Sequence, residues 1–259
     1  MKINKEKYVS HIKDYNKIID MRRIIDKIEL VLNNHYTETT DFLDPYERLL
    51  AKSILNRFPD IKYFEKGGNP ESERQIIIIC NNYTDNIDLN ITVLRITGDL
   101  ENLSHKDFLG AILNLGIKRS KIGDILVHKD YTDIIVKKDI SDFILFNLEK
   151  VANKKIFITE EPLESLSPVE PSYKELNKTL SSLRLDVYIS ATYNLSRQES
   201  MNIIKSGYVK VNWEPVDKPA KELEAGDTIS IKGYGRSILY SIEGLSKKDK
   251  IRTSIRILI

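Results

Sequence analysis

The sequence predicts an α+β fold of three units: a helical N-terminal domain (residues 1–58), a central domain (59–160) and a small α+β module (183–259). Three observations predict this organisation. Apolar residues recur at helical spacing in the first part, and short β-rich runs alternate with helical segments in the second. A stretch rich in Pro, Ser and Glu (161–182) then reads as an interdomain linker.

The first 58 residues are predicted to be helical because one apolar stripe runs between charged residues. The stripe consists of Ile12, Ile18, Ile19, Ile24, Ile25, Ile28 and Leu32. A further helix should begin at Asp44, which can cap it, with Pro45 in the first turn and Glu47 completing a capping box. This helix should end before Pro59.

The central domain is predicted from the order of its elements. The expected elements are strands at 61–65, 75–80 and 89–96, a helix at 104–115, strands at 125–128 and 133–136, a helix at 139–151 and a strand at 155–159. Counted from Leu89, the order is strand, helix, strand, strand, helix, strand. This split βαβ order is typical of ferredoxin-like and RNA-recognition-like sandwiches, which serve many functions.

Composition excludes several classes of protein. The 259 residues are 41% hydrophobic and 30% charged with a formal net charge of +2, so the chain is not a polycation that coats nucleic acid. A single cysteine, Cys80, excludes an internal disulfide framework and a Cys-rich zinc site. The four histidines lack metal-ligand spacing, and the N-terminus lacks the apolar core of a signal peptide. We expect a cytoplasmic monomer without a metal, a cofactor or a membrane partner.

The C-terminal third carries the positive charge and the most informative motif. Residues 171–259 hold 15 basic and 10 acidic residues. Ser196 and Glu199 should form a capping box, which places Arg197 at a helix start where amide N–H groups are free and the dipole is positive. An arginine there does not help the helix, but together with the amides it can bind a phosphate. Arg184 has the same position at the preceding helix.

This stretch resembles the S-four RNA-binding module, named after a small-subunit ribosomal protein. Arg-Leu-Asp at 184–186, Ser-Arg at 196–197, Gly-Tyr-Val-Lys-Val-Asn at 207–212 and Gly-Asp at 226–227 occur in the family's order. The resemblance implies binding to the RNA backbone. The candidate RNA-binding residues are Arg184, Ser196, Arg197, Gln198, Lys205, Lys210, Asn212, Lys218 and Arg236. Trp213 replaces the family's glycine, so we expect a longer hairpin loop, with Trp213 either packed or stacked on a base.

A narrower resemblance, to the YlmH family, covers nearly the whole chain. It is carried by residues 42–47, 107–111, 115–119, 122–125, 211–213 and 233–236. In that family the Trp after Val-Asn is expected. The resemblance implies a central RNA-binding domain, association with the large ribosomal subunit and a role in ribosome-associated quality control of stalled peptidyl-tRNA.

A second basic group follows the expected end of the central helix at Gly116. Lys118, Arg119 and Lys121 either complement the negative end of the helix dipole or form a second loop that contacts phosphates. In the latter case Gly123 would allow RNA to approach the backbone closely.

These observations favour a non-enzymatic protein that binds ribosomal RNA or tRNA. Two alternatives stay open: an RNA-modifying enzyme with an appended RNA-binding module, and an adaptor protein for cell division. Asp186 belongs to a motif that is catalytic in pseudouridine synthases, but its place in the binding module favours a structural, arginine-pairing role. We expect alanine at Arg184 and Arg197 to weaken RNA binding and leave thermal stability nearly unchanged.

Overall fold

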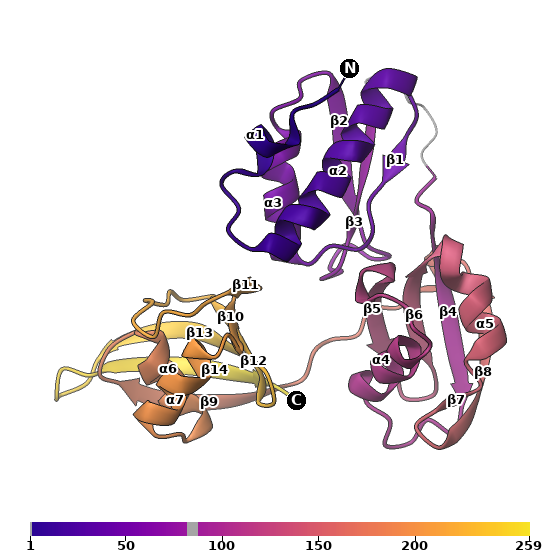
Figure 1. Ribbon diagram of the computed structural model, residues 1–259. Coiled ribbons are helices and arrows are strands. Elements are labelled where there is room, and N and C mark those ends of the chain that lie inside the picture. The colour runs from indigo at the N-terminus through magenta and orange to yellow at the C-terminus, as the bar shows by residue number, and fades with distance from the viewer. Residues whose placement is uncertain (1, 82–87) are drawn as a thin grey trace. The chain divides into compact units, whose positions relative to one another are not determined.

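The computed structural model describes residues 2–81 and 88–259, and the chain divides into two compact units, residues 1–169 and 170–259 (Figure 1). The predicted α+β class is confirmed. The first unit contains the N-terminal and central parts of the chain, and the second contains the C-terminal module.

The N-terminal part is a helical layer on a small sheet. Its elements are α1 (Lys5–Val9), α2 (Tyr15–Asn34), β1 (Glu38–Thr39), α3 (Pro45–Leu55), β2 (Ile61–Lys66) and β3 (Ile76–Asn81). The strands pair in the antiparallel order β1-β3-β2. Alternate residues of the sheet, Ile61, Ile77 and Ile79, join the apolar stripe of α2 in one core. The expected boundary at residues 58/59 therefore separates two strands from the helices on which they pack.

The predicted start of α3 is confirmed in detail. Asp44 accepts a hydrogen bond from the Glu47 amide at 2.8 Å, and Glu47 accepts one from the Asp44 amide at 2.7 Å. Pro45 occupies the first helical position, where its missing N–H breaks no helix hydrogen bond.

The central part has the predicted split βαβ topology. Its elements are β4 (Ile91–Gly98), α4 (His105–Asn114), η1 (Arg119–Lys121), β5 (Ile122–Val127), β6 (Thr132–Lys137), η2 (Lys138–Ile140), α5 (Ser141–Asn147), β7 (Lys150–Val151), β8 (Lys154–Glu161) and η3 (Leu163–Ser165). The antiparallel order β5-β6-β4-β8-β7 is ferredoxin-like. Helices α4 and α5 cover one face of the sheet through a core around Phe108 and Ile144. Helix α5 is shorter than expected because residues 150–155 form a hairpin.

The C-terminal unit packs two helices on one face of a six-stranded sheet (Figure 1). Its elements are β9 (Tyr173–Leu180), α6 (Leu185–Tyr193), α7 (Arg197–Lys205), β10 (Val209–Val211), β11 (Glu214–Pro215), β12 (Thr228–Ile231), β13 (Gly235–Leu245) and β14 (Ile251–Leu258). The strand order is β11-β10-β12-β13-β14-β9.

The predicted linker, residues 161–182, is not one irregular segment. Leu163 and Leu166 pack on a core of the first unit, and β9 pairs with β14 along its whole length. The change of unit falls between Val169 and Glu170, close to Pro168 and Pro171.

Candidate nucleic-acid interface

Two arginines lie at the starts of the paired helices of the C-terminal unit. Arg184 is the residue that precedes α6, and Arg197 is the first residue of α7. Ser196 accepts a hydrogen bond from the Glu199 amide at 3.1 Å, and Glu199 accepts one from the Ser196 amide at 2.8 Å. This capping box fixes the start of α7 as predicted, and with it the position of the Arg197 side chain.

Asp186 holds both arginines. Its carboxylate accepts bonds from Arg184 Nε and Nη2, both at 3.0 Å, and from Arg197 Nε at 3.2 Å. The Asp186 side chain is fully buried, whereas the side chains of Arg184 and Arg197 are 37% and 61% exposed. Burial acts to raise the pKa of Asp186, but the bonds from the two arginines outweigh it and the pKa is lowered. The interpretation of Asp186 as an arginine-pairing residue is confirmed.

The pairing orients the two cations without neutralising them. The cluster Arg184–Asp186–Arg197 has a net charge of +1, and each guanidinium has five N–H donors, of which Asp186 engages one or two. Both groups can therefore donate to phosphate oxygens while they remain paired. Alanine at both positions would leave the buried Asp186 carboxylate without cations, so the structure predicts a loss of thermal stability in that double variant in place of the unchanged stability expected from the sequence.

The structure places the remaining candidates of this unit on helix α7, on the sheet and in a loop. Gln198 and Lys205 are exposed on α7, and Gln198 Nε2 donates to Asn202 Oδ1 at 3.0 Å. Lys210 and Arg236 lie on the sheet face opposite the helices, because both flank Ser230 in register while their neighbours Val209, Val211 and Ser237 are buried. Lys218 is exposed in the loop after β11.

Asn212 and Trp213 form the turn between β10 and β11. Val211 pairs with Glu214, so the loop has two residues, and the expectation of a longer loop is wrong. Both turn residues have positive φ, 51° and 64°. Asn212 fixes the turn because its side chain donates to Asp227 Oδ1 at 2.7 Å and accepts from the Thr228 amide at 2.9 Å. Trp213 is half-buried, with the Arg236 guanidinium carbon 5.2 Å from its ring centroid.

The second basic group, Lys118, Arg119 and Lys121, contains one exposed side chain and two that contact other parts of the first unit. Lys118 is exposed. Lys121 bridges Asp41 and Asp139 at 3.0 and 2.7 Å. Arg119 donates to the carbonyls of Ile122 and Gly123, and burial lowers the pKa of its guanidinium to about 10. Arg119 and Lys121 thus stabilise this part of the first unit.

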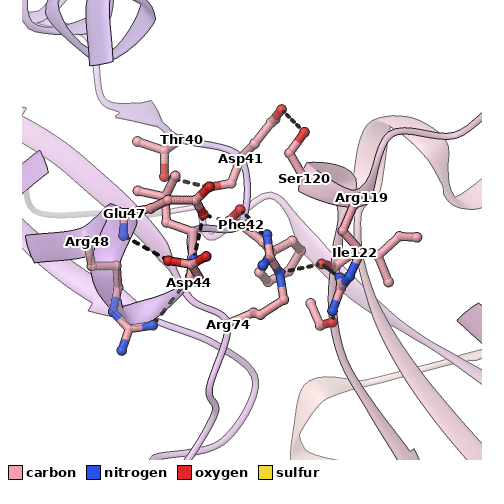
Figure 2. Close-up of polar contacts among 12 residues, drawn as sticks. Thr40, Asp41, Phe42, Asp44, Glu47, Arg48, Arg74, Arg119, Ser120 and Ile122 are labelled. Atoms are coloured by element: carbon pink, nitrogen blue, oxygen red, sulfur yellow. Dashed lines mark hydrogen bonds and ion pairs between the residues drawn. The ribbon is translucent and has the colours of Figure 1, made fainter. Parts of the chain in front are cut away.

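A junction inside the first unit explains the motif around Gly123 (Figure 2). Arg74 donates to the Phe42 carbonyl at 2.7 Å and to the Ile122 carbonyl at 3.2 Å. Asp124 accepts from the amides of Glu73 and Arg74 at 2.7 and 3.0 Å. Gly123 is buried, and the ring of Phe42 occupies the space where a side chain would begin. The close approach at Gly123 is therefore to Phe42 and not to RNA.

Sequence reasoning missed an exposed aromatic on the central sheet. Phe157 of β8 is 64% exposed on the face opposite α4 and α5, with Lys155 Nζ 5.9 Å from its ring centroid. The Arg95 guanidinium stacks on Tyr131 at 4.3 Å near this face. The sequence signal that could have found Phe157 is its place between Ile156 and Ile158 in one strand. Since successive strand residues point to opposite faces, a core containing the two isoleucines leaves Phe157 on the other face.

Neither a metal centre nor a membrane span occurs in the part of the chain that the structure describes. Within residues 2–81 and 88–259, no three His, Cys, Asp or Glu side chains gather into a metal-binding group. The helices of these residues are also too short or too polar to cross a membrane.

Comparison with known proteins agrees with this architecture. Family models match residues 16–84 ("YlmH, N-terminal"), 84–165 ("Putative RNA-binding domain in YlmH") and 183–229 ("S4 domain"). The chain is 31% identical over 243 residues to the ribosome-associated protein quality control protein P2 of Bacillus subtilis, covering 91% of this chain and 94% of the relative. The chain belongs to the YlmH family. The family resemblance predicted from the sequence is confirmed, and the two matched RNA-binding domains support binding to RNA.

Two other proteins show similarity to this YlmH-family chain over shorter spans. A mouse protein, mitochondrial transcription rescue factor 1, is 28% identical over 108 residues, which are 38% of this chain and 45% of the mouse protein. A solved structure of the cell division protein YlmH from Streptococcus pneumoniae matches with a TM-score of 0.50 at 23% identity, covering 60% of this chain and 97% of that one. The second likeness supports the fold alone.

Proposed function

We propose that this protein is a non-enzymatic factor that binds structured RNA on the large ribosomal subunit and acts in quality control of stalled peptidyl-tRNA. The observation that carries the proposal is the cluster Arg184–Asp186–Arg197, two oriented and exposed guanidinium groups at adjacent helix starts in a matched S4 domain. The name of the Bacillus subtilis relative supports the ribosomal setting. Such a factor would act in the cytoplasm as a monomer.

Binding at this cluster would follow from phosphate recognition. Arginine forks donate to phosphate oxygens in fixed geometry, and the start of α7 adds a positive dipole end. These contacts carry no sequence information, so selectivity would come from the shape of folded RNA.

The C-terminal unit has a modest positive charge, with 15 basic and 10 acidic residues in positions 171–259. A few phosphate contacts would give weak binding alone. A second contact through the central domain would raise affinity by holding the RNA at high effective concentration. Exposed Lys118 is a candidate for that contact.

The test is cosedimentation of Arg197→Ala with purified large ribosomal subunits. Arg184 still pairs with Asp186 in this variant, so the fold should persist. Arg23→Ala is the matched control, because the Arg23 side chain is 64% exposed and pairs with an aspartate at 3.1 Å, much as Arg197 does at 61% and 3.2 Å. We expect binding to fall about tenfold for Arg197→Ala and to be unchanged for Arg23→Ala.

Equal binding by both variants would refute the site. Nucleoside analysis of ribosomal RNA and tRNA after incubation with the protein tests the non-enzymatic part of the proposal. A new modified nucleoside would contradict it.

A further inference from the structure

The helix-free face of the C-terminal sheet carries a row of polar side chains across three strands. Lys210 of β10 pairs with Ser230 of β12, which pairs with Arg236 of β13. Directly paired residues project to the same side of a sheet. The residues on either side, such as Val209 and Leu239, are buried against the helices, so this row points away from them.

Two aromatic side chains lie against arginines on this face. The Arg256 guanidinium carbon is 3.4 Å from the ring centroid of Tyr240, a stacking distance, and Tyr240 is 49% exposed. Arg256 of β14 pairs in register with Ile238 of β13. Ile238 lies two residues after Arg236 and therefore on the same side of the sheet, so Arg256 lies on that side as well. At the other end of the row, the Arg236 guanidinium lies over Trp213. We call Lys210, Trp213, Arg236, Tyr240 and Arg256 the outer face.

The chemistry of the outer face matches unpaired nucleotides. Bases stack on tyrosine rings and on guanidinium planes, and every base has such a face. Arg256 Nε donates to Glu175 Oε1 at 3.0 Å, which orients the guanidinium and leaves it further N–H donors. Lys210 and Arg236 add two more basic side chains to the row, so a phosphate backbone running along it would meet cations on three strands.

We propose that the outer face binds a single-stranded RNA segment, separate from the structured RNA held at the helix starts. The C-terminal unit would then hold two RNA segments at once, one on each side of its sheet. This inference rests on the proposed function for the identity of the ligand class. It differs from that function in the surface, the RNA form and the interaction, which is stacking.

Trp213 provides a direct readout because it is the only tryptophan of the chain. The experiment titrates the full-length protein with a short oligouridylate and follows tryptophan fluorescence. We expect saturable quenching in the wild type and in Arg197→Ala. Tyr240→Ala should bind the oligonucleotide about tenfold more weakly, whereas Tyr240→Phe should bind as the wild type does. Tyr15→Ala, which changes a 70% exposed tyrosine outside the outer face, is the control.

Three results of this titration would overturn the proposal. They are the absence of quenching in the wild type, quenching that Tyr240→Ala leaves unchanged in a variant that melts normally, and quenching that Arg197→Ala abolishes. The first two outcomes leave the proposed function standing if large-subunit binding still depends on Arg197. In a separate crosslinking experiment, attachment of the outer face to a protein in place of RNA would also overturn the proposal of a single-stranded RNA site.

Discussion

Replacing Gly123 by alanine should destabilise the first unit through a clash with Phe42. An alanine Cβ would lie 2.7 Å from Phe42 Cε1 and 3.2 Å from Ile135 Cβ. The Phe42 ring is fully buried, so it cannot swing into solvent. Overpacking of this kind costs about 1–3 kcal/mol. At roughly 2–4 °C per kcal/mol for a unit of this size, the melting temperature should fall by about 2–12 °C.

The assay is thermal unfolding of the full chain followed by circular dichroism. Gly110→Ala is the matched control, because a Cβ at this position of α4 would meet no heavy atom within 4 Å beyond the adjoining backbone of its own helix. That variant should melt at the same temperature as the wild type or slightly higher, since alanine favours the helix. Gly123→Ala should also cost less in a Phe42→Leu background, where the ring edge is absent.

An unchanged melting temperature for Gly123→Ala would refute the steric argument. So would a double variant, Gly123→Ala with Phe42→Leu, whose loss of stability equals the sum of the losses in the two single variants. RNA binding is a second readout. If Gly123→Ala weakens RNA binding while melting is unchanged, the glycine serves RNA approach and its packing against Phe42 is incidental.

Three further predictions concern charged groups. Burial lowers the pKa of Lys137 to about 8 in the folded protein. Between about pH 8 and 10.5 the unfolded chain therefore holds a proton that the folded chain has lost, so stability should rise with pH. Urea titrations should show a smaller rise for Lys137→Met. The pKa of Asp186 is lowered, so its stabilisation is present above about pH 4 and disappears on acidification, and Asp186→Asn should show a shallower acid decline in stability. Arg119→Ala should lower the free energy of unfolding by about 1–3 kcal/mol and leave RNA binding unchanged. Lys118→Ala should weaken RNA binding and leave stability unchanged, as measured by melting and filter-binding assays.

Local signals in the sequence predicted the fold well. The capping boxes at Asp44 and Ser196 and the end of the central helix just before Gly116 occur in the structure as expected. They could be predicted because caps and turns depend on a few neighbouring residues. The order of the central elements similarly restricted the topology to the split βαβ form.

Pairings between distant segments could not be predicted in the same way. β9 joins the C-terminal sheet through partners in β14, which lie 71–85 residues away in the chain. The prolines near β9 favoured its assignment to a linker. Gly123 meets Phe42 across the junction, and sequence spacing gives no sign of that contact.

The candidate site shows the same limit. The helix starts with Arg184 and Arg197 were predictable, but their shared, buried Asp186 was visible only as part of a motif. Lys210 and Arg236 were grouped with them by charge alone, whereas strand alternation places them on the opposite face. Side-chain direction within a sheet requires the register, which the sequence leaves open.

The most direct measurement is the salt dependence of binding to a structured fragment of large-subunit ribosomal RNA by the wild type and Arg197→Ala. Removing one cation that neutralises a phosphate should reduce the slope of log K against log salt by about one. The account predicts a shallower slope and weaker binding for Arg197→Ala, with Arg23→Ala matching the wild type. Identical slopes for Arg197→Ala and the wild type would mean that this guanidinium touches no phosphate and would contradict the central claim.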